Sequence, residues 1–112
     1  MPTTTSYKRG AFVLLPFPFS DQSAAKLRPA VVARPAFPSE GLIDVALSSA
    51  ANPLLPGEYQ VQFWREAGLL HPSFVKRAIA SVSSSLVRRT LGNLHSGDLA
   101  QLDAALRTWL AL

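Results

Sequence analysis

The sequence contains no cysteine, and this absence excludes several kinds of site. Disulfide bridges, thiolate zinc sites and a thiol nucleophile all require cysteine. No apolar run approaches the roughly 18 residues that a membrane-spanning helix needs, and the polar N-terminus lacks the charged-then-apolar pattern of a secretion signal. We therefore expect a soluble, cytoplasmic protein that does not contact a membrane.

Motifs for cofactors and metals are also missing. The glycines at positions 57, 68 and 92 stand alone, so there is no glycine-rich phosphate loop, and no group of histidines and carboxylates has the spacing of metal ligands. We expect neither a metal nor another cofactor. The two histidines, His71 and His95, lie beside turn-forming residues. Two histidines can act as acid and base on RNA, but two solvated loop histidines are the more common outcome.

What remains is a short, basic chain. Its 112 residues, 48% of them hydrophobic, suffice for a core and predict a single domain over residues 1–112. Seven Asp and Glu residues stand against eleven Lys and Arg, which gives a net charge of +4 at pH 7. Residues 1–38 hold five of the basic residues and one acidic residue. This excess favours a nucleic acid or an acidic protein as partner, although a generic solubilising surface has the same charge.

Short apolar or alternating segments predict five strands. They are residues 11–15, 27–33, 42–48, 59–65 and 77–82. In the third strand, Ile43 and Val45 share the apolar face, and Ser48 ends the opposite face, which we expect to be polar. Residues 20–25 are rich in turn-forming residues and predict a mobile loop.

Two helices are expected after these strands. Residues 83–92 start with serines that can cap a helix and end at Gly92, which suits a left-handed stop. In the last segment Ser96 is a candidate cap, and apolar residues recur at spacings of three and four from Leu99 to Leu110. The order of elements indicates a mainly β fold, a strongly bent sheet or barrel followed by helix, rather than a parallel α/β domain.

Two polar residues at strand ends are candidates for phosphate chemistry. Arg28 precedes Pro29, which biases it towards an extended backbone, and its guanidinium offers a planar fork of donors that suits a phosphate. An arginine at a strand edge can instead discourage aggregation. The hydroxyl of Ser48 can donate to a phosphoryl oxygen, or it can terminate the strand in a side-chain turn.

Three aromatic residues, Phe17, Phe19 and Trp64, are candidates for stacking on nucleic-acid bases. Each also has a structural alternative, because the two phenylalanines can belong to the core and Trp64 to an interface. The sequence pattern leaves both interpretations open.

Longer blocks of the sequence resemble the MazF/PemK family, the toxin halves of bacterial toxin–antitoxin pairs. The resemblance is carried by RGAFVLLPFPFSDQS at residues 9–23 together with KLRPAVV at residues 26–32. It continues through VALSS at 45–49, AGLL at 67–70, PS at 72–73, LGNL at 91–94 and LDAAL at 102–106. It therefore extends over residues 9–112.

The resemblance implies a small SH3-like barrel of the CcdB/PemK type with a C-terminal helix, which works as a homodimer. It implies a metal-independent endoribonuclease that cuts single-stranded mRNA by attack of a ribose 2′-OH on the neighbouring phosphorus. The family's essential arginine falls on Arg28, and its essential threonine falls on Ser48, which keeps the hydroxyl. The expected RNA-binding residues are Phe17, Ser20, Gln22, Lys26 and Ser49. The expected protein partner is an acidic antitoxin whose tail covers Arg28.

Two departures and two alternatives accompany this resemblance. Ala11 stands where relatives usually carry an acidic residue, and Ala78 stands where a glutamine is common. A CcdB-like gyrase poison would use the C-terminal residues, but Trp109 continues the apolar stripe of the last helix, which favours core or dimer packing. A non-enzymatic SH3-like binding module would give Arg28 no role.

Overall fold

The computed structural model describes residues 7–17, 26–36, 41–50 and 55–112. Within these residues the chain forms six strands, a short 3-10 helix and one α-helix. They are β1 (Ala11–Phe17), β2 (Lys26–Arg34), β3 (Leu42–Ser49), β4 (Tyr59–Gln60), β5 (Phe74–Ser83), η1 (Ser84–Leu86), β6 (Arg89–Asn93) and α1 (Ser96–Leu110). In this described part of the chain, no helix has the length and apolar character to cross a membrane.

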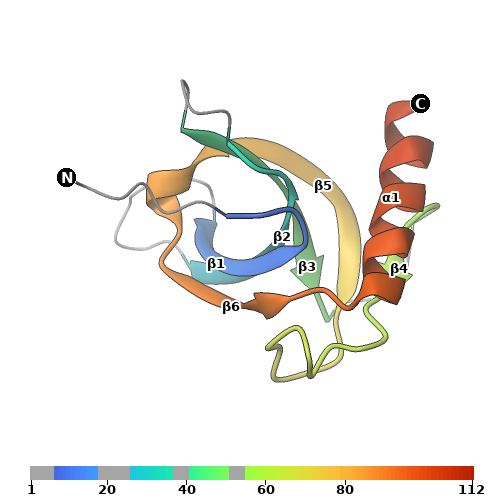
Figure 1. The fold of residues 1–112 in the computed structure, drawn as a ribbon, viewed down its shortest axis with the longest axis horizontal. Helices are drawn as coiled ribbons and strands as arrows, with labels where there is room; N and C mark the ends of the chain where they lie inside the picture. The colour runs from blue at the N-terminus through green and yellow to red at the C-terminus, as the bar shows by residue number, and fades with distance from the viewer. Residues whose placement is uncertain (1–6, 18–25, 37–40, 51–54) are drawn as a thin grey trace.

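The strands form one antiparallel sheet in the order β4-β5-β3-β2-β1-β6. Figure 1 shows the sheet curled into a partly closed barrel, with β5 sweeping round its edge and α1 standing beside β4 and β5. The prediction of a mainly β, barrel-like fold with a C-terminal helix is confirmed.

The central strands are buried on both faces, because each face has its own apolar cluster. The helix-side cluster contains Phe12, Val31, Ala46, Val61, Ala67, Leu69, Val75, Leu94 and Leu102. The opposite cluster contains Ala11, Val13, Leu15, Ala30, Val32, Ile43, Val45 and Val82. Successive residues of β1, β2 and β3 alternate between the two clusters, so these strands are continuous apolar runs in the sequence. The prediction of a polar face on β3 is wrong, since Ala46 and Ser48 are 0% and 3% exposed.

The strand predicted over residues 59–65 is reduced to Tyr59–Gln60, because the backbone N–H groups of Gln62 and Phe63 bind α1 instead of a strand. Asp98, buried in the first turn of α1, accepts hydrogen bonds from Gln62 N at 2.9 Å and Phe63 N at 2.8 Å. The Tyr59 hydroxyl donates to the Asp98 carbonyl oxygen at 3.3 Å. Burial and the nearby Asp98 charge raise the pKa of Tyr59 above its ordinary value. The helix therefore holds the start of the segment that follows β4.

The helix predicted over residues 83–92 is also wrong. Ser83 does act as a cap, but only for the single turn of η1, and Arg89–Asn93 then pairs with β1. Gly92 ends no helix; a Cβ there would lie 2.6 Å from the Ala67 carbonyl oxygen, so glycine allows two backbone segments to touch. The C-terminal helix is confirmed, although its cap is His95 rather than Ser96, with Nδ1 accepting from Gly97 N at 3.1 Å.

Candidate active site

The sheet is split at one end, where β2 and β3 separate. β2 pairs with β3 only from Ala30, which lies opposite Leu47, whereas Ser48 and Ser49 continue to pair with β5. Pro29 stands at the point of separation, and a proline has no N–H to donate to a ladder. Arg28 remains paired with β1 only. The local sequence thus brings Arg28 and the end of β3 to the two sides of one opening.

Two cavities meet at this split. The helix-side cavity, about 350 Å³, has an apolar floor of Leu14, Pro29, Leu69 and Leu91. The opposite cavity, about 230 Å³, is lined by Phe17, Leu47, Lys76 and Ala78. Both cavities are also lined by Arg28, Ser48 and Ser49. The two residues that the sequence singled out as catalytic therefore border the same opening.

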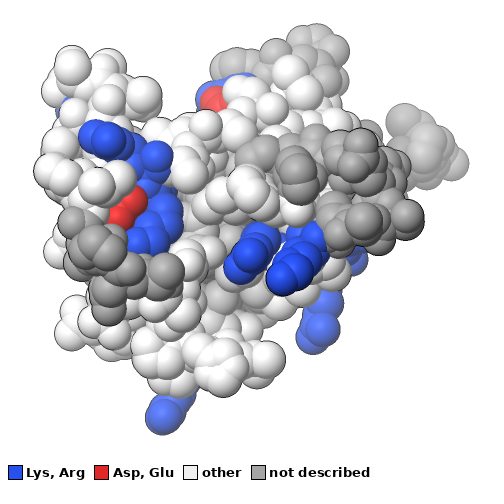
Figure 2. Space-filling model, turned by 180° about the vertical axis from the view of Figure 1, so that it is seen from behind, with Lys and Arg blue, Asp and Glu red and all other residues white. Residues whose placement is uncertain are grey.

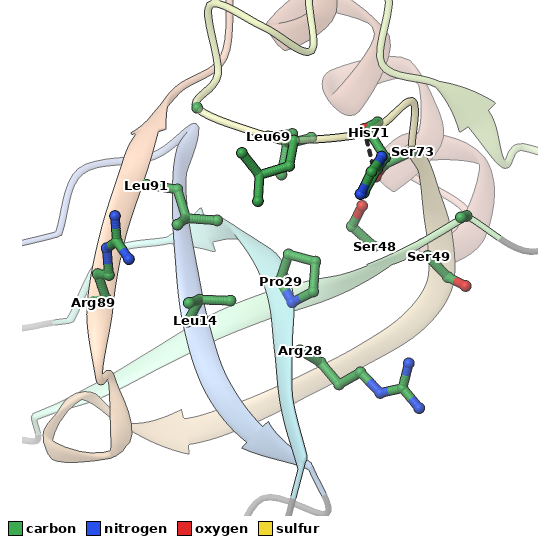
Figure 3. A pocket seen from close by; sticks show the side chains of 13 residues that line it. Leu14, Arg28, Pro29, Ser48, Ser49, Leu69, His71, Ser73, Arg89 and Leu91 are labelled. Carbon is green, nitrogen blue, oxygen red and sulfur yellow. Dashed lines mark hydrogen bonds between the residues drawn. The ribbon is translucent and has the colours of Figure 1, made fainter.

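Arg28 and Ser48 approach this opening from different faces of the sheet. Arg28 shares the alternation of Ala30 and Val32, which belong to the opposite cluster, whereas Ser48 shares that of Ala46 on the helix side. In Figure 3 the Ser48 hydroxyl points towards His71 and Ser73, while the Arg28 side chain extends away from them. A group lying in the split would have the guanidinium on one side and the hydroxyl on the other.

The Ser48 hydroxyl is buried but has no hydrogen-bond partner within the described residues. A buried polar group without a partner costs roughly 1–3 kcal/mol. Buried serines ordinarily avoid this cost by bonding to a nearby backbone carbonyl. Ser48 lines the helix-side cavity, although its hydroxyl oxygen itself has almost no accessible surface.

Residues 67–73 form one wall of the helix-side cavity, held by close backbone contacts. Gly68, at φ +83°, lies against β6, and a Cβ there would come within 2.2 Å of the Leu91 carbonyl oxygen. Leu69 N donates to the Trp64 carbonyl oxygen at 3.0 Å. Val61 N donates to the Ser73 carbonyl oxygen at 2.9 Å, and Ser73 Oγ donates to the His71 carbonyl oxygen at 3.3 Å. The backbone that carries His71 is therefore fixed at both ends.

The helix-side cavity is positively charged. Arg28 from β2 and Arg89 from β6 line it, and none of its described lining residues carries a carboxylate. On the surface seen from behind, Lys and Arg side chains are widely spread, whereas Asp and Glu atoms surface only in small patches (Figure 2). Residues 7–17, 26–36, 41–50 and 55–112 contain no cluster of three His, Cys, Asp or Glu residues that could hold a metal ion. This cavity suits an anion.

In the opposite cavity, Lys76 is paired with a buried carboxylate. Its Nζ lies 3.3 Å from Glu58 Oε1, and the Glu58 side chain is 4% exposed. Burial alone would raise the pKa of Glu58, but hydrogen bonds from Arg77 N, Leu55 N and Lys76 outweigh it and hold the pKa below its ordinary value. The pair is close to neutral. Arg28, in contrast, has no ion pair with any described carboxylate.

The residues predicted to bind RNA fall into three groups. Phe17, 41% exposed, lines the opposite cavity, and Ser49 lines both cavities. Lys26 lies opposite Phe17 in the β1–β2 ladder and is exposed, but it lines neither cavity. Ser20 and Gln22, together with the loop predicted over residues 20–25, lie outside the described residues, as does Phe19.

Sequence reasoning did not assign His71, Ser73 or Arg89 to the site. Ser73 had one signal, the PS pair at residues 72–73 within the resemblance to the MazF/PemK family. His71 was noted only as one of two histidines that can act as acid and base, and nothing indicated Arg89. The structure places all three in the lining of the helix-side cavity. His71 is solvent-exposed, as expected for a loop histidine, yet it faces this cavity. His95 is instead the cap of α1 and stacks on Phe63, with ring centroids 3.9 Å apart.

Three further residues discussed from the sequence are also placed. Trp64 packs against the helix-side cluster, with the Arg65 guanidinium 4.9 Å from its ring centroid, and it lines neither cavity at the split. Ala11 lies in the opposite cluster, away from the cavities. Ala78 lines the opposite cavity beside Arg28, so the glutamine common in relatives would have faced this site.

Comparison with known proteins gives the same family as the sequence blocks. The sequence model of one family, described as a PemK-like, MazF-like toxin of type II toxin–antitoxin system, matches residues 8–110. The Mycobacterium tuberculosis toxin MazF-mt6 has a TM-score of 0.70 and 19% sequence identity, over 91% of this chain and 97% of that chain. An endoribonuclease in complex with its cognate antitoxin from a mycobacterial species has a TM-score of 0.69 and 13% sequence identity, over 93% of this chain and 94% of that chain. No curated protein matches the sequence. At these identities the structural likeness concerns the fold alone.

Proposed function

Because this chain belongs to the family of PemK-like, MazF-like toxins of type II toxin–antitoxin systems, we propose that it is a metal-independent endoribonuclease that cleaves single-stranded RNA. The name of one similar structure, an endoribonuclease bound to its cognate antitoxin, supports this activity. RNA as the substrate also agrees with the basic charge of the chain. We propose that the protein acts on this RNA in the cytoplasm.

One observation carries this proposal. Arg28 and Ser48 border the same split between β2 and β3, and the Ser48 hydroxyl has no hydrogen-bond partner among the described residues. A phosphate in the split would accept two hydrogen bonds from the guanidinium fork of Arg28. It would also accept the hydrogen bond that Ser48 Oγ lacks. The apolar floor of Leu14, Leu69 and Leu91 offers contact area for a base attached to that phosphate.

The chemistry needs no nucleophile from the protein. The ribose 2′-oxygen forms a bond to phosphorus, the bond from phosphorus to the 5′-oxygen breaks, and the products end in a 2′,3′-cyclic phosphate and a 5′-hydroxyl. The transition state carries more negative charge on the phosphoryl oxygens than the substrate does. Donors held in place for that charge are worth roughly 3–4 kcal/mol each, and Arg28 and Ser48 are the residues that we assign to this role.

The test is cleavage of a long single-stranded RNA by the purified protein in EDTA, with Arg28→Ala beside it and the fragment ends analysed. We expect wild-type fragments with 2′,3′-cyclic phosphate ends, and a fall of roughly 100–1,000-fold in kcat for Arg28→Ala. Arg107→Ala is the matched control, because it removes the same charge from the exposed last turn of α1. Wild-type protein that does not cut RNA, or cleavage that survives Arg28→Ala, would reject the proposal.

The same test decides between this function and the two alternatives. A gyrase poison cuts no RNA and uses residues at the C-terminus. Of these, Leu110 and Leu112 are exposed, whereas Trp109 packs on the helix-side cluster and its Nε1 donates to the Pro56 carbonyl oxygen at 2.9 Å. That contact supports a packing role for Trp109. A non-enzymatic binding module would keep every measurable activity after Arg28→Ala.

The proposed partners follow from charge and family together. We expect an acidic antitoxin segment to lie over the helix-side cavity, since the described lining of this cavity has arginines and no carboxylate. We also expect a homodimer. Cleavage assays with the purified antitoxin measure the first expectation, because occupancy of the cavity blocks access to Arg28, and sedimentation of the toxin alone measures the second.

A further inference from the structure

The helix-side cavity contains many hydrogen-bond donors and one side chain suited to accept a proton. Its described polar lining consists of two arginines, three serines and His71. A guanidinium has no acceptor at neutral pH, and a serine hydroxyl is a weak base. Histidine is the residue type that takes and releases a proton near neutral pH. On the basis of the proposed function, we propose that His71 is the general base that removes the proton of the ribose 2′-OH.

The position of the imidazole fits this role. In Figure 3 the Ser48 hydroxyl points towards the His71 ring, and both residues line the helix-side cavity. The His71 carbonyl oxygen is held by Ser73 Oγ, and the Ser73 carbonyl oxygen is held by Val61 N. No described residue hydrogen-bonds to the ring itself, and the residue is solvent-exposed. The backbone is therefore anchored, while the ring nitrogens remain available to a substrate.

The proposed step balances with groups that are present. The 2′-OH gives its proton to an imidazole nitrogen as the 2′-oxygen bonds to phosphorus. The 5′-oxygen leaves with the electron pair of its bond to phosphorus and takes a proton from water. The imidazolium then returns its proton to the hydroxide that remains. Arg28 and Ser48 stabilise the phosphoryl oxygens during this step and do not have to change their protonation.

The second histidine provides an internal control. His95 caps α1 through Nδ1 and stacks on Phe63, and it does not line the helix-side cavity. The two histidines therefore do not form one acid–base pair in this cavity. His95→Asn keeps a side chain that can cap the helix, so it removes the same ionisable group without disturbing the fold.

A pH profile can be assigned to His71, because the charged groups that face it do not titrate near neutral pH. Arg28 on β2 and Arg89 on β6 are the charged residues in the described lining of the cavity, and arginine stays protonated. A pH dependence of kcat/KM that is present in the wild type and lost when His71 is replaced would therefore report protonation of the imidazole. The effect of a general base on a rate is typically 100- to 10,000-fold.

The experiment measures kcat and KM of the full-length wild-type protein, His71→Gln, His71→Ala and His95→Asn in EDTA between pH 5 and 9 on one single-stranded RNA. We expect kcat to fall roughly 100-fold or more in both His71 variants, with KM little changed and the acidic limb absent. Added imidazole should restore cleavage to His71→Ala in proportion to the concentration of free base. His95→Asn should behave as the wild type.

Each other outcome contradicts the inference in a recognisable way. If the wild type cuts RNA and Arg28→Ala does not, while His71→Gln keeps kcat and the acidic limb, His71 is not the base and the proposed function stands. If His71→Gln raises KM alone and imidazole restores nothing, His71 only binds RNA. If the wild type does not cut RNA, the proposed function and this inference fail together.

Discussion

The two faces of the curled sheet differ in what covers them. On the opposite face, the cluster of Val13, Leu15, Val32, Ile43 and Val45 is built from β1, β2 and β3, with Val82 added from β5. On the helix-side face, the cover consists of α1 and of residues 61–69, which come from outside the central strands. That cover stops at Leu69, and the helix-side cavity begins there.

Away from the split, where Arg28 also lies on the opposite face, this difference separates stability from the candidate site. There the opposite cluster is closed by the strands together with residues such as Tyr7, Leu86 and Val87, so its side chains can pack without regard to a substrate. The helix-side cover leaves Leu14 and Leu91 only partly buried, and the Ser48 hydroxyl is buried without a hydrogen-bond partner among the described residues. A cover made of turns can end early and leave such an opening, which a regular strand would have filled.

The largest effect should come from deleting side-chain volume on the opposite face. Ile43 is 0% exposed there and lines neither cavity at the split, so Ile43→Ala should lower the free energy of unfolding by about 2–5 kcal/mol. Cleavage per folded molecule should be unchanged. The comparison variant is Leu91→Ala on the floor of the helix-side cavity, which should cost about 1 kcal/mol and raise KM for RNA. Chemical denaturation and cleavage kinetics of both variants measure this contrast. Equal effects of the two substitutions on KM would contradict it.

A smaller effect should follow from Asp98→Asn, which weakens the attachment of the helix-side cover to α1. The carboxylate accepts from both Gln62 N and Phe63 N, and an amide keeps one accepting oxygen. We expect the unfolding free energy to fall by about 1–3 kcal/mol. Because residues 67–73 follow this attachment, kcat should fall as well at temperatures where the variant is fully folded. A variant with normal kcat would show that the cavity wall does not depend on Asp98.

The smallest change in stability, and one of opposite sign, is expected for Ser48→Ala. Removing a buried hydroxyl without a partner should raise the unfolding free energy by about 1 kcal/mol. The same change should lower kcat roughly 100-fold, as for the loss of a transition-state donor. A paired melting and cleavage experiment measures both. Lower stability would mean that Ser48 Oγ has a structural partner and is not held in reserve for a substrate.

The local sequence pattern predicted the elements whose own apolar residues decide which positions are buried. Apolar runs identified β1, β2 and β3, and the three-four spacing from Leu99 to Leu110 identified α1, because these segments bury the faces that their periodicity marks. The alternation at 59–65 and the capping serines before Gly92 misled because distant groups decided the outcome. Asp98 takes the backbone donors of one segment, and the edge of β1 takes those of the other.

The site was predictable only where it lies on strands. Arg28 and Ser48 were candidates because each lies at a strand end, and the resemblance to a known family assigned roles to them and to Ser49; all three border the split. His71 lies in a turn whose position over Ser48 depends on the contact between Gly68 and Leu91. No local pattern encodes a contact between residues so far apart in the chain.

The two tryptophans give the molecule an optical asymmetry. Trp64 and Trp109 are the only ones in the sequence, and both pack against the helix-side cluster. The Trp109 ring also lies over Gly57, where a Cβ would come within 2.4 Å of Nε1. Tryptophan emission is thus a local signal for the helix-side cover, since β1, β2 and β3 contain no tryptophan. Quenching and time-resolved emission can follow that cover as it loosens or closes, independently of whether the sheet itself stays intact.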